Sequence, residues 1–370
     1  MIIGCVKEIK KHEYRVGLTP QHAFNYIEHG HTVLIERNAG VGSGFSDDEY
    51  VKLGAVMIDT AEEVWARAEM IIKVKEPLPA EYPLIRENQI LFTYLHLAAD
   101  KKLTLAMMES KAIGIAYETI VDRAGGLPLL KPMSEIAGRL SVQEGAKYLE
   151  KPFGGAGVLL AGVPGVRKGH VMVIGGGTVG TNAVQIAIGM GADVSVFDRN
   201  IDRLCELDQL FGSRIQTVYS TPASVREYLR KADVVIGAVL IPGASAPKVV
   251  TKEMLSLMRK GSVLVDVAVD QGGCFETTHA TYHDAPTFEV DGIIHYCVAN
   301  MPGAVPRTST IALTNATLRY GLLIADNGVK KAIMKEPGLI AGINTCQGKL
   351  TYEAVATALD LEFTPYTELC

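Results

Sequence analysis

The sequence predicts an α/β protein of two domains, each built on a parallel, doubly wound sheet. Three observations lead to this prediction. Strand-like apolar runs alternate with helix-like segments along the chain, as they do where helices cover both faces of a parallel sheet. The length of 370 residues suits two domains of ordinary size. Near the middle of the chain, a glycine-rich turn joins a strand-like run to a helix-like one.

The composition is that of an ordinary globular protein. Hydrophobic residues make up 48% of the chain, charged residues 21%, and the net charge is −5. No basic run suggests nucleic acid, so we expect a small-molecule partner. The uncharged stretch 171–192 contains polar residues and a glycine cluster, and the N-terminus lacks a signal-peptide pattern. We therefore expect no membrane contact and a cytoplasmic location.

The six cysteines are scattered, with no C-x-x-C spacing. This pattern favours neither a zinc site nor a disulfide framework. We expect reduced thiols that are mostly buried, and no bound metal.

The elements of the first domain follow in order. A strand at 2–6 precedes a helix from about Pro20 to His29, with Thr19 as N-cap and Pro20 as the first helical residue. The remaining runs predict strands at 32–36, 70–74, 90–94 and 114–116, and helices at 61–67 and 101–110.

A helix that starts near Pro132, with Ser134 as its N-cap, is expected to carry the chain into the second domain. There the apolar runs predict strands at 171–174, 194–197, 234–238, 263–267 and 293–298. A long helix at about 309–324 then leads back. The predicted domains are accordingly 1–130 joined with 306–370, and 131–305.

The most specific motif of the chain lies in the second domain. Gly175, Gly177 and Gly180 follow a strand-like run and open a helix with G-x-G-x-x-G spacing. Gly175 permits a tight turn, Gly177 lets backbone N–H groups approach a pyrophosphate, and Gly180 allows close packing of helix on strand. Asp198 ends the next strand, where an acid hydrogen-bonds the adenosine ribose. This domain is therefore predicted to be a Rossmann domain that binds NAD.

Two alternatives bear on this motif. A glycine-rich turn also occurs for packing alone, but the flanking strand, helix and acid favour a nucleotide site. Arg199 could in principle meet a 2′-phosphate, but Asp198 would repel that phosphate. The sequence thus favours NAD over NADP.

Four polar residues are candidates for chemistry: Arg15, Lys75, His96 and Asp270. Arg15 lies in a loop of the first domain, Lys75 and His96 end strand-like runs, and Asp270 follows one. The carboxyl ends of strands hold ligands in open α/β sheets. Each also has an ordinary interpretation. Arg15 and Lys75 could be solvated surface charges, His96 could be a half-buried packing histidine, and Asp270 could be a helix cap or turn acid. Spacing alone leaves both interpretations open.

Several segments resemble the alanine dehydrogenase and nicotinamide nucleotide transhydrogenase family. Residues 4–20 are similar to its first signature and residues 173–198 to its second. Residues 141–150 and 302–310 resemble the alanine dehydrogenase branch, and the similarity extends essentially end to end. The chain departs from the family at four positions. Val6 and Arg319 stand where proline is usual, His12 where asparagine is usual, and Gly17 where alanine is usual.

The resemblance implies a role for each candidate. Arg15 and Lys75 would bind the substrate carboxylate and carbonyl, and His96 and Asp270 would act in proton transfer. At position 203 relatives often have lysine. The resemblance and the glycine motif together imply cofactor contacts at Ser134, Gly175, Gly177, Thr178, Val179, Gly180, Asp198, Arg203, Ser220, Val239, Leu240, Val267, Val298, Asn300 and Met301.

The implied reaction is the NAD-dependent, reversible oxidative deamination of L-alanine to pyruvate, ammonium and NADH, in a homohexamer. The discontinuous domain would bind substrate and the Rossmann domain NAD. Three alternatives remain: the nucleotide-binding subunit of a proton-translocating transhydrogenase, a lysine-forming saccharopine dehydrogenase, and an NAD-binding regulatory protein without catalysis. The pairing of Lys75 with His96 argues against the first, and the charged cluster against the last.

Overall fold

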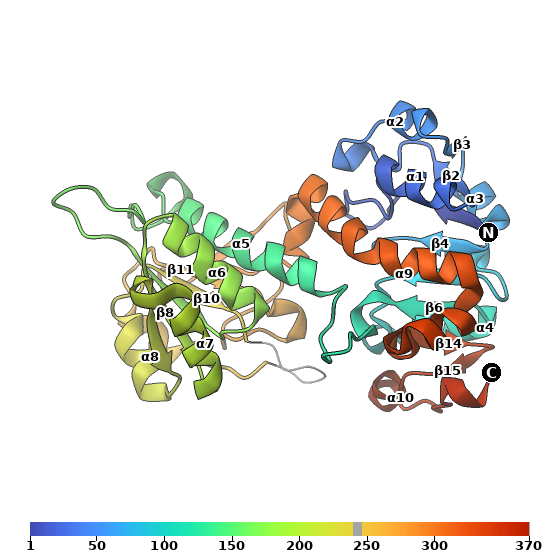
Figure 1. The fold of residues 1–370 in the computed structure, drawn as a ribbon. Coiled ribbons are helices and arrows are strands. Elements are labelled where there is room, and N and C mark those ends of the chain that lie inside the picture. Colours follow the sequence, from blue (N-terminus) through green and yellow to red (C-terminus); the bar gives the residue numbers. More distant parts are fainter. Residues whose placement is uncertain (240–245, 370) are drawn as a thin grey trace. The chain divides into compact units, whose positions relative to one another are not determined.

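The computed structural model describes residues 1–239 and 246–369, and these form two compact units (Figure 1). Unit 1 comprises residues 1–133 and 305–370, and unit 2 comprises residues 134–304. The chain passes from unit 1 into unit 2 within helix α5 (Lys131–Tyr148). It returns to unit 1 immediately before helix α9 (Pro306–Lys335). Unit 1 is therefore discontinuous in sequence.

Unit 1 contains an eight-stranded sheet in the order β15-β14-β6-β5-β4-β1-β2-β3. Strands β1 to β6 are parallel, whereas β14 and β15 pair antiparallel at one edge. The strands are β1 (Ile2–Cys5), β2 (Thr32–Glu36), β3 (Val56–Ile58), β4 (Met70–Ile72), β5 (Ile90–Thr93), β6 (Ile113–Ala116), β14 (Ile343–Cys346) and β15 (Lys349–Leu350). Besides α9, the helices are α1 (Pro20–Glu28), α2 (Asp47–Lys52), α3 (Ala61–Arg67), α4 (Lys101–Ser110) and α10 (Glu353–Leu359).

Unit 2 contains a seven-stranded sheet in the order β12-β13-β11-β10-β7-β8-β9. All neighbours are parallel except the β12–β13 pair at one edge. The strands are β7 (His170–Ile174), β8 (Asp193–Asp198), β9 (Gln216–Tyr219), β10 (Val234–Gly237), β11 (Val263–Asp266), β12 (Thr287–Val290) and β13 (Ile293–Tyr296). The remaining helices are α6 (Thr178–Gly189), α7 (Ile201–Phe211) and α8 (Pro222–Leu229). The strand order reverses between β7 and β10, which is the switch point where open sheets of this kind bind ligands.

The predicted fold class is confirmed, and the predicted elements agree with most of the observed ones. Thr19 caps α1 as expected, because its side chain accepts a hydrogen bond from the backbone N–H of His22. The assignment of Ser134 as an N-cap is wrong. Helix α5 begins at Lys131, so Ser134 lies inside it, and Pro132 stands in the first turn, where proline is tolerated.

Other predicted boundaries are shifted. Strands β4 and β5 end at Ile72 and Thr93, so Lys75 and His96 lie in the loops that follow and not on the strands. Helix α9 is longer at both ends than the predicted 309–324. The predicted contact Leu240 lies outside the described residues.

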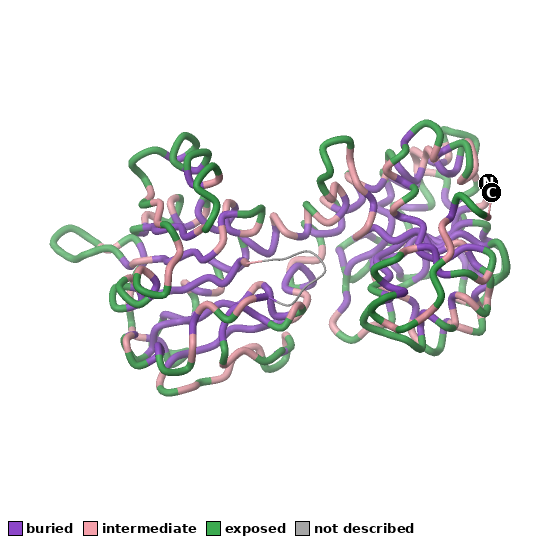
Figure 2. Tube along the Cα trace, turned by 90° about the horizontal axis from the view of Figure 1, so that it is seen from below, coloured by how far each residue is buried: buried purple, intermediate pink, exposed green. Residues whose placement is uncertain are grey.

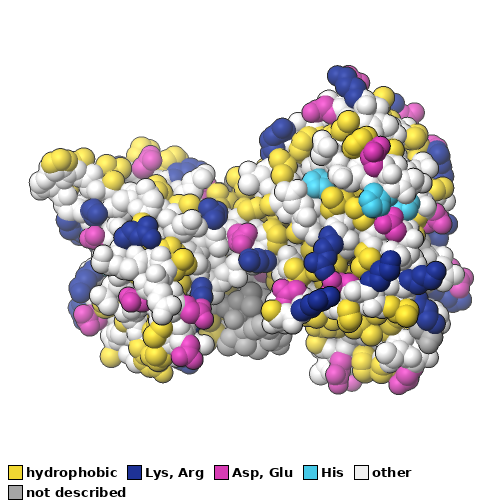
Figure 3. All heavy atoms as spheres, viewed as in Figure 1, with side chains coloured by type: hydrophobic (Ala, Val, Ile, Leu, Met, Phe, Trp, Pro, Cys, Tyr) yellow, Lys and Arg dark blue, Asp and Glu magenta, His cyan; other side chains and the backbone are white. Residues whose placement is uncertain are grey.

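Each unit has its own hydrophobic core. In unit 1 the core includes Trp65, Leu91 and Met107, and in unit 2 it includes Phe197, Leu264 and Phe275. Figure 2 shows the buried residues along the inner strands of each unit and the exposed ones on the loops. On the face drawn in Figure 3, apolar side chains and charges of both signs are interspersed.

In the described part of the chain, no helix combines the length and the apolar character needed to cross a membrane. Four of the five described cysteines are buried, Cys205 is exposed, and all five are free thiols, as expected.

Candidate active site

Three of the four predicted chemical residues belong to unit 1, in loops that follow strands. Arg15 lies in the loop after β1, Lys75 after β4 and His96 after β5. Strands β1, β4 and β5 are adjacent and parallel, so their carboxyl ends lie at one edge of the sheet. The structure therefore brings these three residues to the same sheet edge.

Arg15 is buried, with 2% of its surface exposed, so its interpretation as a solvated surface charge is wrong. Its Nε and Nη2 atoms donate to the two carboxylate oxygens of Glu13, at 2.7 and 2.6 Å, and its Nη1 lies 3.0 Å from Sδ of Met133. Burial by itself would raise the pKa of the Glu13 carboxyl, but the hydrogen bonds and charge of Arg15 lower it to about 2. The pair is thus ionised and rigid.

Lys75 is half-buried, and burial and the charge of Arg15 lower the pKa of its ammonium. Its backbone N–H donates to Glu8 at 3.2 Å, and its carbonyl oxygen accepts from the hydroxyl of Thr93 at 3.0 Å. No hydrogen bond or ion pair of its Nζ is found among the described residues. A half-buried ammonium of this kind can bind a carbonyl or carboxylate oxygen.

His96 has a left-handed backbone, with φ 49° and ψ 35°. This conformation is unfavourable for a residue with a side chain. The Glu118 carboxylate stabilises it by accepting the backbone N–H of His96 at 2.6 Å and that of Leu95 at 3.2 Å. The imidazole stacks on the Tyr94 ring, with centroids 5.8 Å apart, and its side chain is 43% exposed. It is therefore no buried packing histidine, and its ring is accessible for proton exchange.

Sequence reasoning missed the acids that position these residues. The carboxylate of Glu13 binds the Arg15 side chain. Glu8 accepts from the backbone N–H of Lys75, and Glu118 accepts from that of His96. Glu13 is close to Arg15 in sequence, but the need for a carboxylate follows only from the burial of Arg15, which the folded chain reveals. Glu8 and Glu118 are distant from their partners in sequence, so only the folded chain reveals them.

Unit 2 holds the glycine-rich turn between β7 and α6. Gly175 has a φ of 103°, and a Cβ on it would lie 2.6 Å from the carbonyl oxygen of Ala238. A Cβ on Gly180 would lie 1.8 Å from the carbonyl oxygen of Gly175, whereas one on Gly177 would meet no atom within 4 Å. Glycine at 175 and 180 is therefore required by the protein's own packing. The space beside Gly177 is open for a ligand, as the motif predicts.

Asp198 ends β8, as predicted, and both of its carboxylate oxygens accept backbone N–H groups. Oδ2 accepts from Gly176 at 2.7 Å and Oδ1 from Asn200 at 2.9 Å. Each oxygen retains acceptor capacity for ribose hydroxyls. Arg203 donates to the carbonyl oxygen of Gly176 at 2.7 Å and to the hydroxyl of Thr181 at 2.6 Å. Both side chains therefore hold the glycine-rich turn in place.

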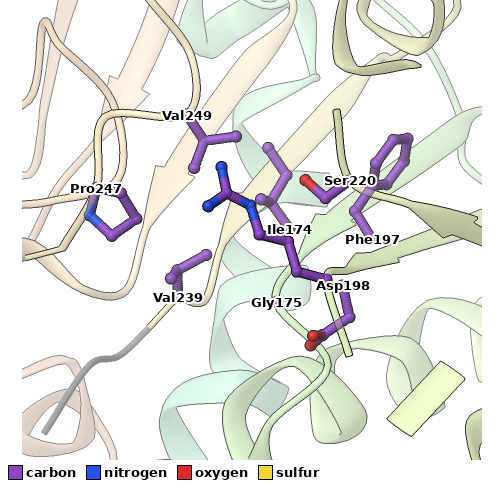
Figure 4. A pocket seen from close by; sticks show the side chains of 9 residues that line it. Ile174, Gly175, Phe197, Asp198, Ser220, Val239, Pro247 and Val249 are labelled. Carbon is purple, nitrogen blue, oxygen red and sulfur yellow. The ribbon is translucent and has the colours of Figure 1, made fainter. Parts of the chain in front are cut away.

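A cavity of about 160 Å³ opens at the carboxyl ends of β7 to β10 (Figure 4). Ser220 and Val239, both predicted cofactor contacts, line it together with Asp198. Figure 4 shows Pro247 and Val249 on the side of the cavity opposite Asp198. Arg199, the residue considered above as a contact to a 2′-phosphate, also lines this cavity. Apolar side chains suit the flat faces of an adenine ring, and a carboxylate suits the hydroxyls of a ribose.

The remaining predicted residues of unit 2 are spread over several elements. Thr178 and Val179 begin α6, and Val267 follows β11. Asp270 is exposed in a short 3₁₀ helix at Val269–Gln271. The other three are Val298, which is buried, Asn300, which has a φ of 63°, and Met301, which begins a 3₁₀ helix.

Unit 1 thus holds a buried arginine, a half-buried lysine and an accessible histidine, and unit 2 holds a glycine-rich turn and a carboxylate of the kind that bind dinucleotides. A nicotinamide dinucleotide would be held by the turn at Gly175–Gly180 and by Asp198. Such groups suit hydride transfer on a small substrate that carries a carboxylate.

Two family models match the chain. The model described as "Alanine dehydrogenase/PNT, N-terminal domain" matches residues 4–137, and "Alanine dehydrogenase/PNT, C-terminal domain" matches residues 141–353. An alanine dehydrogenase of Methanococcus maripaludis is 56% identical over 99% of this chain and 98% of its own. One of Bacillus subtilis is 55% identical over 99% of this chain and 96% of its own.

Solved structures agree with these relatives. A structure described as an L-alanine dehydrogenase superposes with a TM-score of 0.95 at 52% identity, covering 97% of this chain and 99% of its own. A transhydrogenase from Sinorhizobium meliloti superposes with a TM-score of 0.83 at 25% identity, covering 95% and 100%. The similarity to the dehydrogenases is thus the higher in both sequence and structure.

Proposed function

This chain belongs to the alanine dehydrogenase/PNT family, and from that premise we propose that it catalyses the NAD-dependent, reversible oxidative deamination of L-alanine to pyruvate, ammonium and NADH. The observation that carries the proposal is the arrangement of buried Arg15, half-buried Lys75 and accessible His96 at one edge of the unit 1 sheet, within a chain more than half identical to alanine dehydrogenases.

In this proposal the substrate binds to unit 1. The guanidinium of Arg15 binds the carboxylate, an interaction that its planar group makes with high geometric specificity. The ammonium of Lys75 donates to the C2 oxygen of pyruvate and stabilises the charge that develops there. Burial and the charge of Arg15 lower the pKa of this ammonium.

Deamination moves several protons, because a water must add to the imine and ammonia must leave. His96 is the proposed proton donor and acceptor, since an imidazole exchanges protons near neutral pH. Asp270 is the proposed acid on unit 2 that activates the water or holds the substrate ammonium.

Bound NAD would supply the acceptor for the hydride that leaves C2 of alanine. In this proposal unit 2 binds it, with the pyrophosphate beside Gly177 and the ribose of the adenosine on Asp198. The proposed contacts include Arg203, whose guanidinium supports the turn. The other proposed contacts are Ser134, Thr178, Val179, Ser220, Val239, Leu240, Val267, Val298, Asn300 and Met301.

A homohexamer in the cytoplasm completes the proposal, by analogy with the family. The transhydrogenase alternative is less well supported, because that similarity is only 25% identity, against 56% for a dehydrogenase. The saccharopine alternative is less well supported, because the relatives that are more than half identical to this chain are described as alanine dehydrogenases.

The test is a steady-state survey. The purified protein is assayed with pyruvate, ammonium and NADH, and in parallel with lysine, 2-oxoglutarate and NADH. Each reaction is repeated with NADPH. Rapid NADH oxidation that requires both pyruvate and ammonium, with no turnover of lysine and 2-oxoglutarate, supports the proposal. Turnover of lysine with 2-oxoglutarate, or no turnover in either assay, refutes it.

A further inference from the structure

Glu13 has no role in the reaction described above, yet its carboxylate accepts hydrogen bonds of 2.7 and 2.6 Å from Arg15. Its carboxylate lies two residues before Arg15, and both side chains are buried, with 0% and 1% of their surfaces exposed. Taking two charges out of water is costly, so a pair of this kind requires close geometry. The inference that follows rests on the proposed function, because it assigns Arg15 to the substrate.

The geometry of the pair restricts the guanidinium to one orientation. Two parallel hydrogen bonds, at 2.7 and 2.6 Å, join one edge of the Arg15 guanidinium to the two Glu13 oxygens. The same Glu13 carboxylate also accepts the backbone N–H of Arg15 at 3.1 Å. Because the acid binds both ends of the residue, the side chain cannot rotate without breaking at least two charge-assisted bonds.

We propose that Glu13 is a positioning residue that holds the Arg15 guanidinium in the orientation required to bind the substrate carboxylate, and that its charge balances Arg15 beside Lys75. A preorganised cation loses less entropy when the substrate binds than a mobile one does. Glu13 thus acts through Arg15 and does not contact the substrate.

The charges around Lys75 give Glu13 a second effect. Burial and the charges of Arg15 and Lys10 lower the pKa of Lys75, whereas Glu76 and Glu13 raise it. Glu76 itself forms an ion pair with Lys10. Removal of the Glu13 charge therefore leaves Lys75 with a lower pKa, and Lys75 loses its proton at lower pH.

The test compares Glu13→Gln and Glu13→Asp in the reductive amination of pyruvate with ammonium and NADH. Glutamine keeps the size of the side chain but removes its charge. We expect the KM for pyruvate to rise by about tenfold or more, because the buried charge of Arg15 loses its partner. The alkaline limb of the pH profile should move to lower pH. Aspartate keeps the charge but is shorter by one methylene, so KM should rise while the alkaline limb stays near its wild-type position.

Two further variants separate positioning from general damage. Glu63→Gln removes the carboxylate of an exposed pair with Arg67 and should change neither KM nor the pH profile. In an Arg15→Lys background, Glu13→Gln should raise KM much less than it does in the wild type, because lysine cannot make the bidentate pair. Circular dichroism and thermal melts report whether each variant is folded, and NADH binding, measured by fluorescence, reports whether unit 2 is intact.

Three outcomes would overturn the inference: an unchanged KM and alkaline limb in Glu13→Gln, an equal rise of KM in the Arg15→Lys background, or a lower alkaline limb in Glu13→Asp. If Glu13→Gln does not fold, Glu13→Asp alone decides, since an unchanged KM in that variant is also contradictory. A wild-type protein inactive with pyruvate would instead refute the proposed function.

Discussion

At the scale of single residues, the pair of Glu13 and Arg15 links stability to the site. The interaction with Arg15 lowers the pKa of the Glu13 carboxyl from an ordinary 4.5 to about 2. A carboxyl whose pKa is depressed in the folded state stabilises the fold above its unfolded pKa. This stabilisation is full above about pH 4.5 and is lost as the pH falls toward 2.

Replacement of Arg15 should expose this linkage. Arg15→Ala leaves the buried Glu13 without its cation, so the free energy of unfolding near neutral pH should fall by about 3–5 kcal/mol. The deficit should shrink as the pH falls from about 4.5 toward 2, because wild-type Glu13 then also becomes protonated. Urea unfolding at several pH values measures it, and a deficit independent of pH would contradict this account. Where the variant is folded, pyruvate turnover should be lost while NADH binding is retained.

Asp198 is the second residue with a testable role. Asp198→Asn removes the charge that repels a 2′-phosphate, so the ratio of kcat/KM for NAD over NADP should fall by about tenfold or more. Asparagine can still accept one of the two backbone N–H bonds at this position. Asp193→Asn is the matched control, since Asp193 is exposed at the opposite end of β8. A wild-type protein that uses both cofactors equally would disprove this role.

At the scale of elements, the β7–α6 turn combines two requirements that the sequence motif does not separate. Gly175 and Gly180 are glycines because backbone atoms of the protein lie within 2.6 Å of any Cβ placed there. Gly177 is surrounded by open space, so only a ligand would exclude a side chain. The same motif thus serves both folding and binding.

Alanine substitutions should separate these two requirements. Gly180→Ala should destabilise the protein by about 1–3 kcal/mol, because α6 must shift away from Gly175. Gly177→Ala should keep its stability but bind NADH more weakly. Gly189→Ala is the control, because Gly189 lies at the other end of α6 and no atom lies within 4 Å of the new Cβ. Its free energy of unfolding should rise by about 0.5–1 kcal/mol, and it should bind NADH normally. Thermal melts and NADH titrations measure both quantities, and normal NADH binding by Gly177→Ala would show that no ligand approaches that glycine.

At the scale of the whole molecule, the proposed proton-transfer groups belong to separate units. His96 lies in unit 1 and Asp270 in unit 2, although both are assigned to one substrate. Groups that work as a unit in catalysis show strongly non-additive losses. The kinetics of the two residues therefore test whether both units act on the same reaction.

His96→Ala and Asp270→Ala should each lower kcat by about 10²–10⁴-fold. The double variant should lose less than the product of the two single losses. Measurement of pyruvate amination across the pH range gives all three values. Near-normal kcat for His96→Ala would remove its role as a proton shuttle, and fully multiplicative losses would mean that the two residues act independently.

The sequence by itself determined the fold class, the glycine motif, the acid at the end of β8 and the family. These features are local, since periodicity, capping at Thr19 and the spacing of Gly175 to Gly180 depend on neighbours in the chain. For the same reason, the start of α5 was misassigned. Serine at position 134 has the character of a cap, but Pro132 is compatible with a helix that begins earlier.

Only the tertiary structure decided which charges are buried and which acids hold them. Arg15 and Lys75 looked like possible surface charges, because burial depends on contacts with segments far away in sequence. Glu8 and Glu118 act on residues 67 and 22 positions away, across neighbouring strand ends. Such pairings follow from strand order in the sheet, and strand order is a property of the folded chain that no local pattern contains.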